Sequence, residues 1–373
     1  MTTVHYRYAT VQARRLFYRE AGPRGAPDVV LLHGFPASSF MFRDLIPLLA
    51  DRYHLIAPDH VGFGLSDAPA TDEFGYTFDA LAGLTAGLLA QIGVTRYAMY
   101  VHDYGAPIGW RLALADPGAV TAIITQSGNG YGAGLAEEFW KPLREYWQDQ
   151  NPQTEAPLRQ ALALEAIRWQ YLHGVPDQTL VSPDTWYHDL ALVSRPGNDL
   201  IQLALFADYA TNLPLYPKLH AYLRDSGVPL LAVWGRNDQI FVPEGALAFA
   251  GDAPGAEIHL LDGGHFLLES QLDAAAGSIR ASSVGHCHDR TPPGSDRAGH
   301  RAGWRDRPRG RLADLTAARS GCRSTPGDRG QGHLPGVIDT GAWDALGKQG
   351  KADYFTDMCP RNPARRSLGL RAP

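Results

Sequence analysis

Short apolar runs alternate with amphipathic stretches along the first part of the chain. The runs at 29–33 and 97–101 are brief and uninterrupted, which is typical of strands buried on both faces of a sheet. Residues 77–92 instead carry apolar side chains at helical spacing. Strands that alternate with helices predict an α/β fold with a mainly parallel central sheet. Further strands are predicted at 55–57, 120–124, 229–234 and 257–260, and a last helix from about residue 270 to 280.

The pattern changes between residues 131 and 222. This segment is rich in Trp, Tyr and Leu at helical spacing, it has no convincing strand, and strands resume after it. A helical segment inserted into an α/β core predicts a cap. We therefore divide the chain into a first core part (1–130), a helical cap (131–222) and a second core part (223–280).

Composition shifts abruptly after residue 280. Arg, Gly, Pro and Ala dominate residues 281–373, apolar periodicity is lost, and no glutamate follows Glu269. Such a segment buries too little apolar surface to offset its loss of conformational entropy, so we predict a disordered tail. One interpretation is a basic interaction tail that binds nucleic acid loosely. The other, which we favour, is translation from a shifted reading frame of a GC-rich gene.

The overall composition is that of a globular protein. The 373 residues are 45% hydrophobic and 20% charged, which suits one large soluble domain or two. The net charge of −5 predicts neither nucleic acid nor an anionic membrane as partner, and no apolar run is long enough to span a bilayer. The first 21 residues lack the apolar core of a secretion signal, and all three cysteines lie beyond residue 280. Disulfides are therefore not implied, and we expect a cytoplasmic protein. The sequence does not indicate its oligomeric state.

Asp103 occupies the junction between an apolar strand and a helical pattern. Small residues follow it in His102-Asp103-Tyr104-Gly105-Ala106, so that the helix can begin close by, which is typical of a nucleophile elbow. Attack of a carboxylate on an ester or amide carbonyl would give a high-energy anhydride, whereas attack on a saturated carbon gives an ordinary ester. Asp103 therefore predicts displacement at an alkyl carbon, opening an epoxide or expelling a halide, through a covalent alkyl-enzyme intermediate.

Two later segments supply the partners that this chemistry needs. Asp238 follows the strand at 229–234, and His265 follows the strand at 257–260, so both are predicted at the sheet edge where open α/β sheets keep their sites. We assign His265 as the general base that activates water, and Asp238 as the acid that orients it. The backbone N–H groups of Phe35 and Tyr104 are predicted to form the oxyanion hole, with Phe35-Pro36 as a candidate cis bond.

Over residues 3–280 the chain resembles the α/β-hydrolase superfamily, and within it the branch of epoxide hydrolases and haloalkane or haloacetate dehalogenases. The resemblance implies the same roles for Asp103, Asp238 and His265, and a cap that covers the site. It implies no cofactor and no metal. The motifs that carry it are His33-Gly34-Phe35-Pro36, Asp59-His60-Val61-Gly62-Phe63-Gly64-Leu65-Ser66-Asp67, His102-Asp103-Tyr104-Gly105, Trp234-Gly235-Arg236-Asn237-Asp238 and Gly264-His265-Phe266.

Departures from family patterns bear on the substrate. Haloalkane dehalogenases usually place Trp after the nucleophile, and haloacetate dehalogenases place Arg there; this chain has Tyr104. Epoxide hydrolases commonly have an aromatic residue where Phe35 stands, and they use cap tyrosines to protonate the leaving oxygen. Tyr209 is the best candidate for that role. In a second cap segment, an inward Trp169 would suit a halide and an inward Tyr171 would suit an epoxide, and the sequence does not decide between them.

We therefore favour an epoxide hydrolase that acts on a small apolar epoxide. Haloalkane dehalogenation of a halogenated substrate is the first alternative. A non-catalytic ligand-binding protein built on a hydrolase scaffold is the second, and measurable multiple turnover would exclude it.

Overall fold

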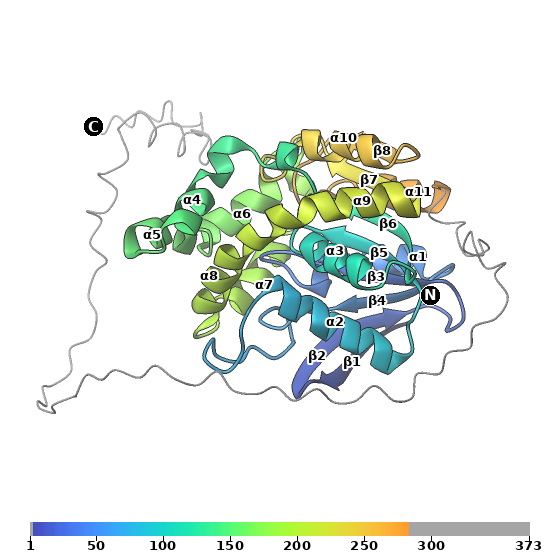
Figure 1. The fold of residues 1–373 in the computed structure, drawn as a ribbon, viewed down its shortest axis with the longest axis horizontal. Helices are drawn as coiled ribbons and strands as arrows, with labels where there is room; N and C mark the ends of the chain where they lie inside the picture. Colours follow the sequence, from blue (N-terminus) through green and yellow to red (C-terminus); the bar gives the residue numbers. More distant parts are fainter. Residues whose placement is uncertain (1–2, 283–373) are drawn as a thin grey trace, which may run out of the picture. The chain divides into compact units, whose positions relative to one another are not determined.

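The computed structural model describes residues 3–282, and the tail from residue 283 onward, with its predicted disorder, lies outside the described residues. In the described part, a sheet of eight strands has the order β1-β2-β4-β3-β5-β6-β7-β8 (Figure 1). The pairs β1–β2 and β2–β4 are antiparallel, and the other neighbouring pairs are parallel. The prediction of a mainly parallel α/β sheet is confirmed. The strands are β1 (Val4–Val11), β2 (Arg14–Ala21), β3 (Asp28–Leu32), β4 (His54–Pro58), β5 (Tyr97–His102), β6 (Val120–Gln126), β7 (Leu230–Gly235) and β8 (Glu257–Leu261).

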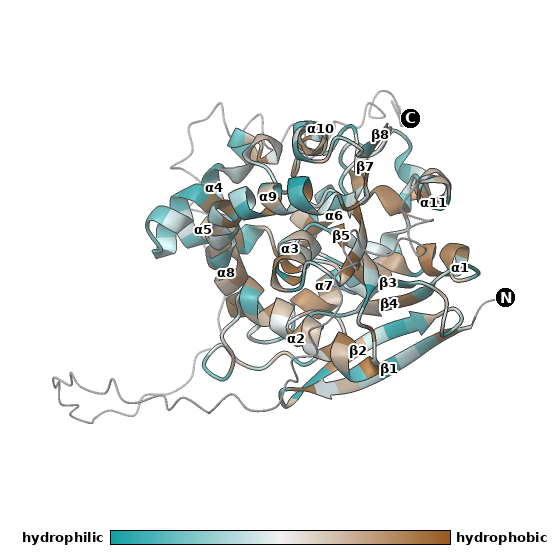
Figure 2. Ribbon diagram, turned by 45° about the vertical axis from the view of Figure 1, so that its right-hand side comes forward, coloured by the Kyte–Doolittle hydropathy of each residue, from teal (hydrophilic) through white to brown (hydrophobic). Residues whose placement is uncertain are grey.

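Helices cover both faces of this sheet. On one face α2, α3, α9 and α10 pack side by side in that order, and on the other α1 packs against α11 (Figures 1 and 2). Because both faces are covered, every residue of β5 and of β7 is buried, which explains why these strands are apolar except for His102 at the end of β5. The helices are α1 (Leu45–Leu49), α2 (Phe78–Ile92), α3 (Gly105–Ala115), α9 (Tyr216–Ser226), α10 (Pro243–Asp252) and α11 (Leu272–Ala281).

The chain between β6 and β7 contains the helices that the sequence predicted as a cap. Figure 1 shows α4 to α8 gathered beyond one end of the strands. The outer helices α4 and α5 carry many hydrophilic residues in Figure 2. Helix α9 begins inside the predicted cap but packs against α3 and α10 of the core layer. The cap helices are α4 (Glu137–Gln148), α5 (Pro152–Gln160), α6 (Leu164–Leu172), α7 (Pro183–Val193) and α8 (Asn198–Asp208), followed by the 3-10 helix η4 (Tyr209–Leu215).

The β1–β2 hairpin, α1 and α10 are among the elements that the sequence pattern does not predict. The β1–β2 hairpin lies at the edge of the sheet, and β1 turns Tyr6 and Tyr8 outward, 65% and 46% exposed, so its apolar residues do not mark a buried face. Helix α10 is rich in Ala and Gly, which give a weak periodic signal. Within residues 3–282, no helix combines the length and the apolar character needed to cross a membrane.

Candidate active site

Asp103 lies at a sharp turn between β5 and α3. Its φ of 47° is in the left-handed region, where a non-glycine residue is strained, by about 1–3 kcal/mol. The helix can begin at once because Gly105 has no side chain: a Cβ there would lie 2.1 Å from the Leu32 carbonyl oxygen. Gly34 is constrained in the same way, since a Cβ there would lie 2.3 Å from Asp103 Oδ1. The two glycines let backbone pack directly against the turn that carries the Asp103 carboxylate.

Two backbone N–H groups converge on one oxygen of this carboxylate. The N–H groups of Phe35 and Tyr104 each donate to Asp103 Oδ1 at 2.6 Å. The Phe35-Pro36 peptide bond is cis, as the sequence suggested. The two N–H groups hold Oδ1 in place, and neither of them contacts Oδ2. Charge that develops on Oδ1 would be stabilised by the same two donors.

Two buried histidines hold the turn that carries Phe35. His33 Nδ1 contacts the Gly34 carbonyl at 3.1 Å, and its Nε2 accepts the His60 backbone N–H at 3.1 Å. An imidazole with these two partners carries its proton on Nδ1 and is neutral. Burial lowers the pKa of His33 to about 4, so it stays neutral at physiological pH. His33 is therefore a structural residue of the site.

His265 lies between the carboxylates of Asp238 and Asp103. Its Nδ1 lies 3.0 Å from Asp238 Oδ2, and its Nε2 lies 4.0 Å from Asp103 Oδ2. The Asp238 carboxylate favours the tautomer with the proton on Nδ1, which directs the lone pair of Nε2 toward Asp103. Nε2 has no hydrogen-bond partner among the described residues. A separation of 4.0 Å suits a bridging water better than a direct hydrogen bond.

Asp238 is fixed by donors on both of its oxygens. Oδ1 accepts the backbone N–H groups of Ile240 at 2.8 Å and Phe241 at 3.1 Å. Oδ2 accepts the Ser127 hydroxyl at 2.7 Å as well as His265. Asp238 is 2% exposed, so these donors replace the water that burial removes. The arrangement can orient an imidazole and stabilise its protonated form.

Burial shapes the electrostatics of the pair formed by Asp103 and His265. It raises the pKa of Asp103 to about 6, although His265 and the N–H groups of Phe35 and Tyr104 oppose the shift. Burial by itself lowers the pKa of His265, but the nearby charges of Asp238 and then Asp103 outweigh it, so the pKa is raised. A carboxylate with this pKa is ionised at neutral pH but close to protonation.

Tyr209 reaches the site from the end of α8. Its ring is 1% exposed and lies 5.9 Å from the ring of Tyr104, centre to centre. Burial raises its pKa well above the usual value; hydrogen bonding to Tyr216 and the negative charge of Asp103 contribute to this shift. The phenol is therefore protonated at neutral pH, close to the predicted nucleophile, with its hydroxyl engaged by Tyr216.

The other two predicted cap residues differ in their contacts. Tyr171 donates its hydroxyl to Asp189, and its ring stacks on Phe266 at 3.9 Å. Trp169 stacks on Phe139 and His173 and is partly exposed. Two positions along a helix turn a side chain by roughly 200°, so these two residues face different ways. The ring of Phe266 lies 5.1 Å from that of His265, so Tyr171 packs against a direct neighbour of the site. An inward Trp169 and an inward Tyr171 both stay predictions.

Comparisons with known proteins identify the family of this chain. Residues 27–271 match the model of the alpha/beta hydrolase fold family. The chain belongs to the α/β-hydrolase family. It is 43% identical over 292 residues, 75% of this chain and 98% of the relative, to a Saccharomyces cerevisiae protein named uncharacterized hydrolase YNR064C.

Solved structures similar to this α/β-hydrolase include both predicted enzyme classes. Haloalkane dehalogenase DbeA from Bradyrhizobium elkani is 25% identical, with a TM-score of 0.61 over 75% of this chain and 96% of that one. Epoxide hydrolase A from Mycobacterium thermoresistibile is 26% identical, with a TM-score of 0.58 over 74% of this chain and 97% of that one. The protein is a hydrolase of this family, and its relatives include epoxide hydrolases and dehalogenases.

Two polar groups of this α/β-hydrolase escape sequence reasoning. The Tyr104 hydroxyl is buried and has no partner among the described residues, although the sequence pointed only to the backbone N–H of this residue. Ser127 directly follows β6, has a φ of 50° and donates to Asp238. A polar residue after an apolar strand, at the sheet edge that carries the site, was the signal for Ser127. Among residues 3–282, no three His, Cys, Asp or Glu side chains gather in a way that would hold a metal ion.

Proposed function

We propose that this α/β-hydrolase opens epoxides to diols through a covalent ester of Asp103. One observation carries the proposal: Oδ1 of Asp103 is held by two N–H donors at 2.6 Å, while Oδ2 faces Nε2 of His265 at 4.0 Å. This geometry supports a division of roles in which Oδ1 bears negative charge and Oδ2 attacks. A carboxylate nucleophile suits a saturated carbon, because the product is an ordinary ester.

In the first step, Oδ2 of Asp103 attacks an epoxide carbon. A carbon–oxygen bond forms as a ring carbon–oxygen bond breaks, and the ring oxygen leaves with the electron pair. That oxygen takes a proton from a phenol beside the nucleophile. Tyr104 is the better-placed donor, since its buried hydroxyl has no partner among the described residues, whereas that of Tyr209 is hydrogen-bonded to Tyr216.

In the second step, water hydrolyses the ester. Nε2 of His265 takes a proton from water, and the resulting hydroxide attacks the Asp103 carboxyl carbon. The N–H groups of Phe35 and Tyr104 stabilise the oxyanion on Oδ1. Collapse expels the product alkoxide, which takes the proton back from His265. The proton left on the Asp103 carboxyl returns to the phenolate, so one water is consumed for each epoxide.

The donors around the site favour an epoxide over a halide. An alkoxide leaving group needs a proton, which Tyr104 and Tyr209 can supply, whereas a halide needs only a hydrogen bond. The indole N–H groups near Tyr209 are already engaged: Trp140 donates to the Ile240 carbonyl at 2.7 Å and Trp147 to the Phe206 carbonyl at 2.8 Å. Dehalogenation through the same ester is the alternative reaction.

The substitution His265→Gln tests the proposal, because it removes the base that hydrolyses the ester and leaves the nucleophile. Incubated with a terminal epoxide, the variant should gain the mass of one substrate on the peptide that contains Asp103. Asp103→Ala should gain none and should produce no diol. A parallel panel of terminal bromoalkanes is scored for halide. Halide release without epoxide opening would show that the protein is a dehalogenase and not an epoxide hydrolase. The absence of any adduct in His265→Gln would contradict the covalent ester intermediate.

A further inference from the structure

A buried side-chain amide contacts the main chain of His265. Gln126 ends β6 and is completely buried, and its Nε2 donates to the backbone carbonyl of His265 at 3.1 Å. The two residues are 139 positions apart, so this bond joins the end of a central strand to the loop that carries the base. Gln126 therefore holds the main chain of His265, whereas Asp238 accepts from its ring.

Tyr100 fixes which way this amide faces. Because the His265 carbonyl only accepts, the amide must turn its NH2 group toward that carbonyl and its Oε1 toward Tyr100. The Tyr100 side chain is 1% exposed, and its hydroxyl donates to Oε1. Burial raises the pKa of Tyr100, so the hydroxyl keeps the proton that it donates. A flipped amide would set two acceptors against each other, so the orientation is determined by its partners.

His102 lies beside the same amide. It pairs with Gln126 in the register of β5 and β6, and its ring lies 4.6 Å from that of His265. Its Nδ1 lies 3.0 Å from the backbone carbonyl of Gln126 and 3.3 Å from the side-chain Nε2. The backbone carbonyl only accepts, so neutral His102 carries its proton on Nδ1. Burial lowers the pKa of His102 well below its ordinary value, and His265 lowers it further, so His102 stays neutral beside the base.

The residue that follows Gln126 fixes the acid. Ser127 donates to Asp238 Oδ2 at 2.7 Å, and the same oxygen lies 3.0 Å from Nδ1 of His265. Two consecutive residues at the end of β6 thus contact the two partners that activate water: Gln126 holds the base, and Ser127 holds the acid.

We infer that Gln126, oriented by Tyr100, positions the base for ester hydrolysis by holding the main chain of His265. With that carbonyl held, Nδ1 stays 3.0 Å from Asp238, and Nε2 stays turned toward Asp103, 4.0 Å from Oδ2. The inference rests on the proposed function and deepens its second step. Because the base acts in ester hydrolysis and not in ester formation, loss of Gln126 should slow only the hydrolysis.

The test follows the mass of the peptide that contains Asp103 during a single turnover of a terminal epoxide. Gain of mass reports ester formation, and its subsequent loss reports hydrolysis. Gln126→Met keeps the side-chain length and removes both polar atoms. The gain should stay within about twofold of the wild-type rate, and the loss should slow by about 10-fold or more, because a small displacement of a catalytic group is costly. The variant should therefore accumulate the ester.

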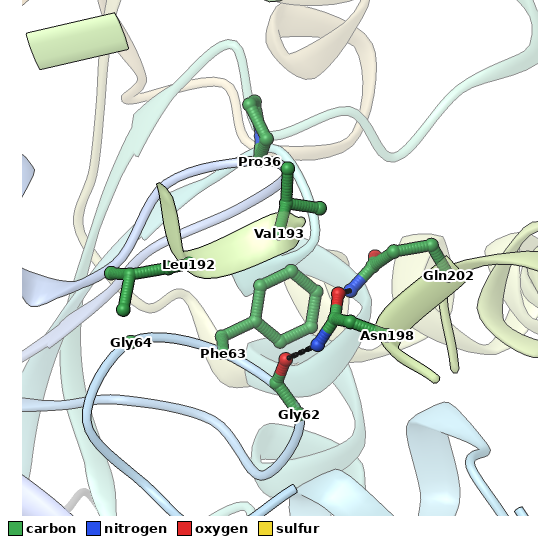
Figure 3. Close-up of a pocket in the computed structure, with 8 residues that line it drawn as sticks. All are labelled: Pro36, Gly62, Phe63, Gly64, Leu192, Val193, Asn198 and Gln202. Atoms are coloured by element: carbon green, nitrogen blue, oxygen red, sulfur yellow. Dashed lines mark hydrogen bonds between the residues drawn. The ribbon is translucent and has the colours of Figure 1, made fainter. Parts of the chain in front are cut away.

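A second buried glutamine supplies the matched control (Figure 3). Gln202 is completely buried; its Nε2 donates to Asn198 Oδ1 at 3.1 Å, and Asn198 Nδ2 donates to the Gly62 carbonyl at 2.7 Å. These bonds connect α8 of the cap to a core loop, at a small cavity between them. Gln202→Met makes the same chemical change without removing a contact of His265, so both rates should equal those of the wild type.

Loss of mass at the wild-type rate in Gln126→Met would overturn the inference. Equal slowing of gain and loss would also overturn it, since that result indicates a general distortion of the site. If Gln126→Met does not fold, Tyr100→Phe takes its place, because it removes only the hydroxyl that orients the amide. The loss of mass should then slow by about 3-fold or more, and an unchanged loss contradicts the inference.

Failure of the proposed function looks different, because then no protein gains mass, the wild type included. In that case, a nuclear magnetic resonance titration of the His265 imidazole decides the matter without turnover. Burial lowers the pKa of His265 and Asp238 raises it, so a ring that is held less firmly beside Asp238 should titrate at lower pH. Such a shift in Gln126→Met, but not in Gln202→Met, supports the inference, and an unchanged titration contradicts it.

Discussion

Ser127 donates its hydroxyl to Asp238 at 2.7 Å, on the same oxygen, Oδ2, that accepts from Nδ1 of His265. Ser127 also has a φ of 50°, so its backbone is strained where its side chain makes this contact. The hydroxyl disperses part of the negative charge that raises the pKa of His265. Ser127 thereby positions the acid and moderates its effect on the imidazole.

Ser127→Ala should therefore raise the pKa of His265 further, because Asp238 loses a donor to its charge. Ester hydrolysis needs neutral His265, so the acidic limb of the kcat profile should move to higher pH, and kcat at pH 7 should fall by about 3- to 10-fold. Ser127→Gly is the matched control, since it removes the same hydroxyl but relieves the positive φ. Both profiles should shift, and only the glycine variant should gain thermal stability. An unchanged profile in both variants would show that Ser127 has no influence on the base.

The substitution Tyr104→Phe should affect catalysis and thermal stability differently. It removes a buried hydroxyl that has no partner among the described residues, so the melting temperature should stay the same or rise. Epoxide opening should nevertheless fall by about 100-fold, the usual effect of losing a general acid. Tyr209→Phe should have a smaller effect on the rate, because that hydroxyl is hydrogen-bonded to Tyr216. If Tyr209→Phe lowers the rate of epoxide opening more than Tyr104→Phe does, Tyr209 and not Tyr104 is the proton donor.

The pH dependence of ester formation follows from the raised pKa of Asp103. A protonated carboxyl does not attack carbon, so the rate of ester formation should fall as the pH falls through about 6. His265 lowers the pKa of Asp103, so in His265→Gln this limb should move to a pH above 6. The measurement is the rate of mass gain in that variant as a function of pH. His5→Gln, an exposed histidine on β1, should leave the kcat/KM profile of the wild type unchanged. A rate of mass gain that stays constant from pH 5 to pH 8 would contradict the assigned nucleophile.

Most of the fold is predictable because buried parallel strands are short and apolar. That pattern locates β3 to β7, and the sequence also predicts the partly buried edge strand β8. The turns after these strands locate Asp103, Asp238 and His265 at one edge of the sheet. A strand's carboxyl end is fixed by local sequence, so residues placed there can be assigned before any contact is known.

Side-chain direction in the cap is not predictable in the same way. The sequence leaves open which of Trp169 and Tyr171 faces inward, and in the structure Tyr171 contacts Asp189 and Phe266. Which partner a phenol finds depends on residues far away in the chain. The Tyr104 hydroxyl is a case of the same kind, since only the packed structure shows that no group within residues 3–282 hydrogen-bonds to it.

One measurement tests the central claim directly: a single turnover of a terminal epoxide with enzyme in excess, in water enriched in oxygen-18. If Asp103 forms the ester, hydrolysis places the heavy oxygen on its carboxylate, and the diol carries an unlabelled oxygen that came from Asp103. We predict a gain of about 2 Da on the peptide that contains Asp103, and an unlabelled diol. A labelled diol with an unlabelled Asp103 peptide would show direct attack by water and would contradict the account.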